Sequence, residues 1–262
     1  MKPLLFARLS HCLSLCLALS LPAMARADTA TGKITGPTAG QTVRIATEGA
    51  FPPFNSLNAA GAPIGFEIDL GNAVCAHQGW TCDWVLHEWS GIIGGLTGGD
   101  YDAIMAGMSI TPSRLKDIDF TREYFLTANQ PKGMFVGIHN FLDPAHSLIA
   151  VQEDTIHEEH LKSLGFRTAS FATAGAALDA VLAGRCDLTF GSPDYLDQRL
   201  YRTGRALSVI GTMDIQAGGA AVAVPKGRDK LRRGFNAALD SLESDGTIER
   251  LRKKWFAKST DI

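Results

Sequence analysis

The sequence predicts an α/β protein made of two similar blocks, each a sheet with helices on both faces. Three observations support this prediction. Strand and helix patterns alternate along most of the chain. The composition, 45% hydrophobic and 20% charged, is that of a globular protein and excludes whole-chain disorder, collagen and coiled coil. A length of 262 residues allows two lobes of roughly 100–150 residues each.

The N-terminal segment, residues 1–27, is predicted to be a secretory signal peptide. It has a basic start with Lys2 and Arg8, an apolar run at 13–21 and an A-x-A site that ends at Ala27. The nine-residue run would make a helix of about 14 Å, which is short for a hydrocarbon core of ~30 Å. A short membrane anchor is the alternative. We expect cleavage after Ala27 and export to the periplasm.

Charge and missing motifs exclude several function classes. Residues 1–27 carry three basic residues and no acidic one, so their removal takes the formal net charge from −2 to −5. An acidic chain is a poor candidate for binding nucleic acid or an anionic membrane. The chain lacks a P-loop and the G-x-S-x-G, H-E-x-x-H and G-x-G-x-x-G motifs. We expect no metal and no cofactor.

The first block follows from apolar spacing. Phe66, Leu70, Val74 and His77 recur at helical intervals, and residues 81–86 alternate as a strand does. The predicted elements are, in order, a strand at 43–47, a helix at 66–77, a strand at 81–86, a short helix that begins at Ile92 and ends near Gly98, and a strand at 101–106. This βαβαβ order predicts a parallel sheet.

The second block repeats the pattern. Its predicted elements are a strand at 148–152, a helix after the capping pair Thr155 and Glu158 that ends near Gly165, a strand at 166–171, a helix at 174–183, a strand at 187–190 and a helix opened by Ser192-Pro193. A strand at 220–224 and two helices follow, with apolar stripes at Leu231, Phe235, Ala238 and Leu242 and at Ile248, Leu251 and Trp255. The blocks join near residues 127–131 and 216–220.

Ligands of open α/β sheets bind beyond the carboxyl ends of the strands. The candidate residues are therefore those that follow each strand: Glu48, Phe51, Phe54, Trp89, Ser90, Ser109, Thr111, Arg114, Asp154, Thr155, His157, Ser192 and Asp194.

Arg114 is the candidate for binding a carboxylate. Thr111-Pro112 resembles a helix N-cap with proline at the first helical position, which would place the guanidinium in the first turn. A guanidinium can bind a carboxylate through two parallel hydrogen bonds. The alternative is a surface arginine that pairs with Asp117 or Asp119.

The aromatic residues Phe51, Phe54 and Trp89 fall in predicted loops, where they could enclose an aliphatic or cationic ligand group. Packing that caps the core is their alternative. Glu48 could hold a ligand cation, or be a solvated strand end.

The candidates of the second block also have structural alternatives. Thr155 could hydrogen-bond a carboxylate, act as a helix cap, or do both. His157 could be a solvated helix residue, and Ser192 could be the cap before Pro193.

Three cysteines remain after residue 27. Cys75 and Cys82 flank a short turn, and an oxidising compartment favours a disulfide between them over a metal site. Cys186 has no partner left and is expected to be a small buried residue.

Four segments resemble the periplasmic solute-binding proteins of polar amino-acid ABC importers. The resemblance is strongest to the lysine/arginine/ornithine/histidine-binding group and its octopine- and nopaline-binding relatives. The segments are IATEGAFPPFN (45–55), IGFEIDLGNAVC (64–75), SGIIGGLTGGDYDAIMAGMSITPSR (90–114) and DGTIERLRKKWF (245–256).

The resemblance implies a type II periplasmic binding protein fold. It has two lobes, each a mixed, mainly parallel sheet flanked by helices, and two hinge strands. Residues 28–127 plus 219–262 would form lobe 1 and residues 131–215 lobe 2, with hinges near 127–131 and 216–220. Such a protein is expected to be a monomer that meets the membrane subunits of the importer transiently.

The resemblance also implies roles for individual residues. Arg114 resembles the arginine that clamps the ligand α-carboxylate, and Thr155 resembles its partner on lobe 2. Phe51 and Trp89 resemble the pair that sandwiches the ligand side chain, and Glu48 resembles the acid that receives a basic side chain. Further implied positions are Ser109, the backbone at Ala106 and Gly107, and the Cys75–Cys82 disulfide.

One departure from the family pattern concerns the ligand nitrogen. Amino-acid binders usually hold the α-ammonium with an aspartate, but Ser192 occupies that position here, with Asp194 two residues on. A serine would tolerate the additional carboxylate-bearing branch of an opine, which an aspartate would repel. If Asp194 reaches inward, a free basic amino acid remains the expected ligand.

Two other functions remain as alternatives. An exported enzyme similar to cyclohexadienyl dehydratases would need a general acid, for which Glu153, Asp154 and His157 are the candidates. A sensor domain of a receptor kinase is disfavoured, because no second apolar stretch approaches 18 residues and no kinase region is present.

Overall fold

The computed structural model describes residues 39–126, 132–139, 141–203 and 207–257. All of them belong to one compact unit, Ile34–Ile262. The predicted signal peptide and the predicted hinge at 127–131 lie outside the described residues.

The first sheet has five strands in the order β5-β1-β6-β13-β7. These strands are β5 (Thr81–Leu86), β1 (Thr42–Thr47), β6 (Ala103–Ile104), β13 (Ala220–Pro225) and β7 (Ile118–Phe125). β1 pairs in parallel with β5 and β6, whereas β13 pairs antiparallel with β6 and β7. The expected mixed sheet is confirmed, but half of its pairings are antiparallel, so "mainly parallel" was wrong.

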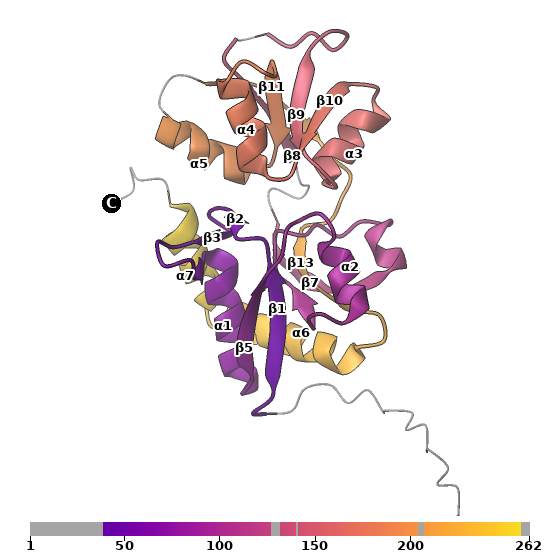
Figure 1. The fold of residues 1–262 in the computed structure, drawn as a ribbon. Helices are drawn as coiled ribbons and strands as arrows, with labels where there is room; N and C mark the ends of the chain where they lie inside the picture. The colour runs from indigo at the N-terminus through magenta and orange to yellow at the C-terminus, as the bar shows by residue number, and fades with distance from the viewer. Residues whose placement is uncertain (1–38, 127–131, 140, 204–206, 258–262) are drawn as a thin grey trace, which may run out of the picture. The chain divides into compact units, whose positions relative to one another are not determined.

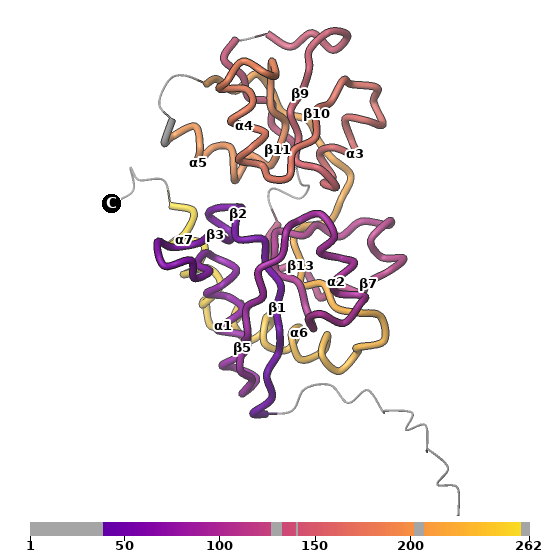
Figure 2. Tube along the Cα trace, viewed as in Figure 1, coloured from indigo at the N-terminus to yellow at the C-terminus, as the bar shows by residue number. Residues whose placement is uncertain are grey.

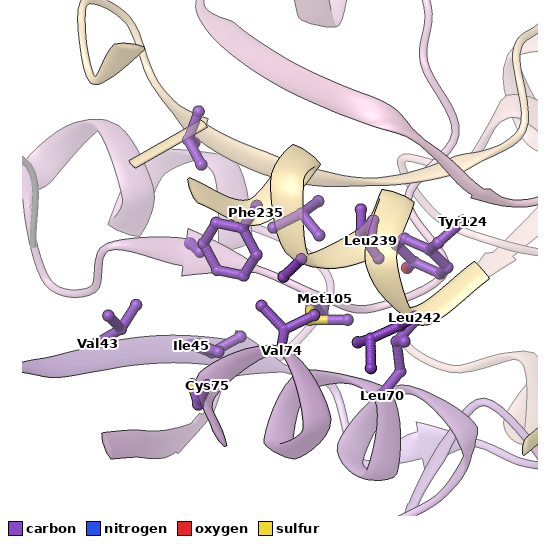
Figure 3. Packing of buried hydrophobic residues seen from close by; sticks show 14 of the residues in the cluster. Val43, Ile45, Leu70, Val74, Cys75, Met105, Tyr124, Phe235, Leu239 and Leu242 are labelled. Carbon is purple, nitrogen blue, oxygen red and sulfur yellow. The ribbon is translucent and has the colours of Figure 1, made fainter. Parts of the chain in front are cut away.

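Helices cover both faces of the first sheet (Figure 1). They are α1 (Phe66–Gln78), α2 (Ile92–Gly98), α6 (Asp229–Ser244) and α7 (Thr247–Phe256). Apolar side chains of α1, α6 and α7 pack on one face, and those of α2 pack on the other. Figure 3 shows Val74 of α1 and Phe235 of α6 meeting over Ile45 of β1, as their predicted apolar stripes require.

The second sheet repeats the arrangement, in the order β10-β9-β11-β8-β12. Its strands are β8 (Lys132–Gly137), β9 (Leu148–Gln152), β10 (Arg167–Phe171), β11 (Leu188–Gly191) and β12 (Ser208–Asp214), and its helices are α3 (Ile156–Ser163), α4 (Ala174–Leu182) and α5 (Pro193–Thr203). α4 and α5 pack on one face and α3 on the other. β8 runs antiparallel to β11 and β12, so this sheet is also evenly mixed.

The chain passes between the two sheets twice, after β7 and after β12. As a consequence, a late part of the chain returns to the first sheet: in Figure 2 the orange segment that carries β13 runs beside the early, purple part. β13 thus joins the first sheet although about 95 residues separate it from β7.

A small third sheet links β1 to α1 and was not predicted. It consists of β2 (Ala50–Phe51), β3 (Asn55–Leu57) and β4 (Pro63–Ile64). The peptide bond between Pro52 and Pro53 is cis and lies within this segment. The small sheet shapes the loop that carries Phe51 and Phe54.

Several local expectations were wrong. Thr111 does accept a hydrogen bond from the Arg114 backbone N–H (3.2 Å), but only a 3₁₀ turn follows (Arg114–Lys116) and not an α-helix. β6 is shorter than the strand predicted at 101–106. His77, which was placed on the helical apolar pattern, and Leu86, the last apolar position of the alternating strand predicted at 81–86, are exposed.

The cysteine expectations are confirmed. Cys75 and Cys82 form a disulfide with an S–S distance of 2.04 Å, and Cys186 is a free, buried thiol. Among the described residues, no helix combines the length and apolar character that crossing a membrane requires.

Gly65 is expected to be essential for the turn into α1. Its φ is +140°, and a Cβ there would lie 2.3 Å from the Phe54 carbonyl oxygen. We predict that Gly65→Ala lowers the free energy of unfolding by about 1–3 kcal/mol in urea denaturation. Gly94→Ala is the control, because it lies in α2 and a Cβ added there would meet no atom within 4 Å. If Gly65→Ala had the same free energy of unfolding as wild type, Gly65 would not be needed for this turn.

Candidate functional site

Of the candidate residues expected from the sequence, Ser90, Thr111 and Asp154 do not line the pocket, whereas twelve others line one pocket together. These twelve are Glu48, Phe51, Phe54, Trp89, Ala106, Gly107, Ser109, Arg114, Thr155, His157, Ser192 and Asp194. They follow strands of both large sheets. The expectation that ligands bind beyond the carboxyl ends of strands therefore selected loops that meet in one pocket. That these residues bind a ligand stays a prediction.

Arg114 lines the pocket and makes contacts to residues of both sheets' loops. Its Nη1 donates to the Ser109 carbonyl (2.9 Å), its Nη2 donates to the Asp154 carbonyl (3.3 Å), and its guanidinium lies 5.3 Å from the Trp89 ring centroid. Among the described residues, Arg114 forms no salt bridge with either alternative partner, Asp117 or Asp119, and Asp119 pairs with Lys226 instead (2.9 Å). Two carbonyl partners leave three of the five N–H donors for a ligand carboxylate.

The charge of Arg114 survives its burial. Burial lowers the pKa of the guanidinium to about 10, and the negative charges of Glu159 and Asp154 oppose this change. The group is therefore still protonated at neutral pH. A half-buried cation with neutral hydrogen-bond partners attracts an anionic ligand more strongly than an exposed one, because less water screens it.

Glu48 supplies the opposite charge in the same pocket. Its Oε1 accepts a hydrogen bond from Gln152 Nε2 (2.7 Å), and the same amide nitrogen donates to the Ala172 carbonyl (3.2 Å). Burial raises the pKa of Glu48 to about 7; the Gln152 bond opposes this rise, and the negative charge of Glu67 adds to it. A ligand cation would restore the ionised form.

Glu67 is a fully buried carboxylate that organises the loops around the pocket. It accepts hydrogen bonds from the Gly107 N–H (2.6 Å), from Asn55 Nδ2 (2.8 Å) and from the Tyr124 hydroxyl. Burial raises the pKa of Glu67, and the three hydrogen bonds lower it. Asn55 in turn accepts from the Gly49 N–H (2.8 Å). The Gly107 N–H is thus already occupied within the protein.

The aromatic residues serve the core and the pocket together. Phe54 and Trp89 are buried and belong to the two apolar clusters of the first sheet, and both also line the pocket. Phe51 stacks on Tyr195 of α5, with ring centroids 5.2 Å apart and an angle of 5° between the planes. It also stacks on Phe54 (5.2 Å). A ligand stem would therefore have to share the Phe51 ring with these neighbours.

The second sheet contributes polar groups. Thr155 Oγ1 accepts from the Glu158 backbone N–H (3.2 Å), which confirms the helix cap, and it lines the pocket as well. His157 faces the Phe190 ring, with centroids 5.7 Å apart. Ser192 and Asp194 both reach the lining of the pocket at the start of α5.

Several residues near the site were missed, and three of them make contacts that matter for it: Gln152, Tyr195 and Glu67. Gln152 and Tyr195 line the pocket, and Glu67 supports it. Glu67 lies in the family-like segment IGFEIDLGNAVC (64–75), which was a usable signal. Gln152 is the last residue of β9 and Tyr195 lies in the first turn of α5, and neither position signals a role in a site. Within the described residues, no three His, Cys, Asp or Glu side chains are grouped as a metal site.

The two-lobed fold and this pocket are those of a solute-binding protein. The model of the family "Bacterial extracellular solute-binding proteins, family 3" matches residues 43–258, and the chain belongs to this family.

Individual relatives agree with this family. The chain is 30% identical to the L-arginine-binding protein of Pseudomonas aeruginosa, over 82% of this chain and 88% of that protein. It is 36% identical to a solved periplasmic His/Glu/Gln/Arg/opine family-binding protein of Silicibacter pomeroyi in complex with lysine, with a TM-score of 0.78 over 83% of this chain and 98% of that one. An ancestral amino-acid-binding protein described as a precursor of cyclohexadienyl dehydratase is 26% identical, with a TM-score of 0.72 over 82% of this chain and 95% of that one. The type II periplasmic binding protein fold is thereby confirmed.

The raised pKa of Glu48 predicts a pH dependence of stability. Between pH 4.5, its ordinary pKa, and about 7, the folded protein retains a proton that the unfolded chain has lost. Stability from this group is therefore highest below pH 4.5 and falls as the pH rises through 7. We expect Glu48→Gln to remove this component, so that the variant gains about 1–3 kcal/mol relative to wild type between pH 4.5 and 8 in urea denaturation. If the free energies of unfolding of wild type and Glu48→Gln changed with pH in the same way, the raised pKa of Glu48 would be contradicted.

Proposed function

We propose that this protein captures a basic amino acid, or an opine derived from one, in the periplasm and delivers it to an ABC importer. The observation that carries the proposal is the opposed pair of charges in one pocket: Arg114 for the ligand carboxylate and Glu48 for its cationic end. The L-arginine-binding relative and the lysine-bound solved structure support the same ligand class.

The opine alternative depends on Ser192. No aspartate stands at that position, so a secondary amine with a second carboxylate would not be repelled there. Asp194 also lines the pocket, and its carboxylate would favour the ammonium of a free amino acid instead. The two ligand types therefore differ in which of these residues faces the ligand nitrogen.

The remaining parts of the proposal concern the whole molecule. The chain works as a monomer without turnover, the signal peptide is removed after Ala27, and the two lobes close about hinges near 127–131 and 216–220. Of the candidate acids for a dehydratase, only His157 lines the pocket, which favours binding over catalysis.

A ligand panel tests the proposal. We expect arginine, lysine, ornithine, octopine or nopaline to raise Tm in a thermal-shift experiment; a ligand at 100 times its Kd adds about 2.7 kcal/mol. Citrulline, the neutral counterpart of arginine, should bind to wild type more weakly than arginine does. The Glu48→Gln variant should bind citrulline and arginine equally well. If none of these ligands raises Tm, the proposal is contradicted. If the protein converts arogenate or prephenate, the dehydratase alternative replaces the binding function.

Arg114 should dominate the affinity. We predict that Arg114→Ala weakens binding by at least ~30-fold in calorimetry, because it leaves the ligand carboxylate buried and unpaired, at a cost of about 2–5 kcal/mol. Lys116→Ala removes an exposed cation two residues on and serves as the control. An Arg114→Ala variant with wild-type affinity would remove this residue from the site.

A further inference from the structure

Asp154 has an unusual backbone conformation at the edge of the pocket. It lies between β9 and α3, and its φ of +56° makes it the one non-glycine residue with a positive φ in the described part of the chain. This region is costly for most residues but is tolerated by aspartate and asparagine. A strained residue of this kind is retained only where the surrounding contacts hold it in place.

Three side chains from the first sheet's side of the pocket converge on this residue. Trp89 Nε1 donates to the Asp154 carbonyl (3.2 Å), and Arg114 Nη2 donates to the same oxygen (3.3 Å). Ser90 Oγ donates to the Asp154 carboxylate (2.9 Å). Trp89 and Ser90 follow β5, and Arg114 opens the 3₁₀ turn before β7. Asp154 therefore joins the elements of one sheet to those of the other.

The turn that presents Asp154 is fixed from its own side. The Asp154 N–H donates to Glu158 Oε2 (2.9 Å), and Glu158 is buried and paired with Lys162 (2.7 Å). Thr155 Oγ1 also donates to the Gln152 carbonyl (2.7 Å). The positive φ directs the Asp154 carbonyl toward Trp89 and Arg114, while the N–H remains bonded within the second sheet's elements.

We propose that Asp154 is a positioning residue that couples capture of the ligand carboxylate by Arg114 to closure of the cleft. Its carbonyl takes one guanidinium donor and fixes the plane of the group, and its carboxylate closes onto Ser90 at the same time. Both contacts require the elements of the two sheets to be together, so a cleft that opens loses them and releases the ligand faster. The negative charge of Asp154 also helps to keep Arg114 protonated, because it raises the guanidinium pKa that burial lowers. This inference rests on the proposed function.

Ligand release from variants of the Ser90–Asp154 contact tests the proposal. Release of L-arginine, or of octopine if only the opine binds, is followed by tryptophan fluorescence in stopped flow. Ser90→Ala and Asp154→Gly each remove one partner, and glycine accepts the positive φ and keeps the carbonyl. We expect each to speed release by about 2- to 12-fold, the range for one hydrogen bond. Both changes remove the same hydrogen bond, so the double variant should release the ligand no faster than the faster of the two single variants.

Two further variants separate positioning from general destabilisation. Asp154→Asn tolerates the positive φ and retains an acceptor for Ser90, so it should release the ligand within about twofold of wild type. Ser163→Ala removes a serine hydrogen bond of 2.7 Å that stays within α3, and should leave release unchanged. Equal release rates for wild type, Ser90→Ala and Asp154→Gly, or multiplicative effects in the double variant, would overturn the proposal.

Small-angle scattering without ligand keeps this test separate from the proposed function. We expect Ser90→Ala and Asp154→Gly to have a larger radius of gyration than wild type and Asp154→Asn. If none of the amino acids or opines binds, the proposed function fails while a larger radius still supports the Asp154 contacts. Equal radii in that case would overturn them.

Discussion

The site depends on two opposite charges that are removed from most of the solvent and kept apart by the protein. Each is held by neutral partners: Arg114 by two carbonyl groups and Glu48 by the Gln152 amide. Neutral partners satisfy hydrogen-bonding groups without cancelling the charge, so the attraction for a ligand of the opposite sign remains. Burial shifts both pKa values toward the neutral forms, and a zwitterionic ligand reverses this tendency at both ends.

The topology explains how both charges come to line the same pocket. Each large sheet ends its parallel strands at the pocket, and the chain crosses between the sheets twice. The antiparallel strands β13 and β8 accommodate these crossings, since each is the strand that enters its sheet from the other one. Two crossings restrain relative motion more than one would, and this geometry suits hinge closure around a ligand.

Much of the fold could be predicted from local patterns, and the failures are instructive. The apolar stripes of α6 and α7, the cap of α3 and the start of α5 at Pro193 were readable because helical spacing and capping chemistry act over a few residues. β7, β8 and β12 were not recognised, because strands interrupted by polar or glycine residues are defined by the neighbours they pair with. The helix expected at Thr111 is only a 3₁₀ turn, since β7 begins at Ile118 and leaves no length for it.

By itself, the sequence determined the alternation of elements, the family resemblance and the identity of twelve of the residues that line the pocket. These depend on residue type and short spacing, which a linear chain displays directly. Only the tertiary structure decided the partners of those residues: Gln152 on Glu48, Tyr195 on Phe51, and Asp154 on Arg114. Such contacts join residues 40 to about 145 positions apart, and no local pattern encodes which side chains two separate sheets will bring within hydrogen-bond distance.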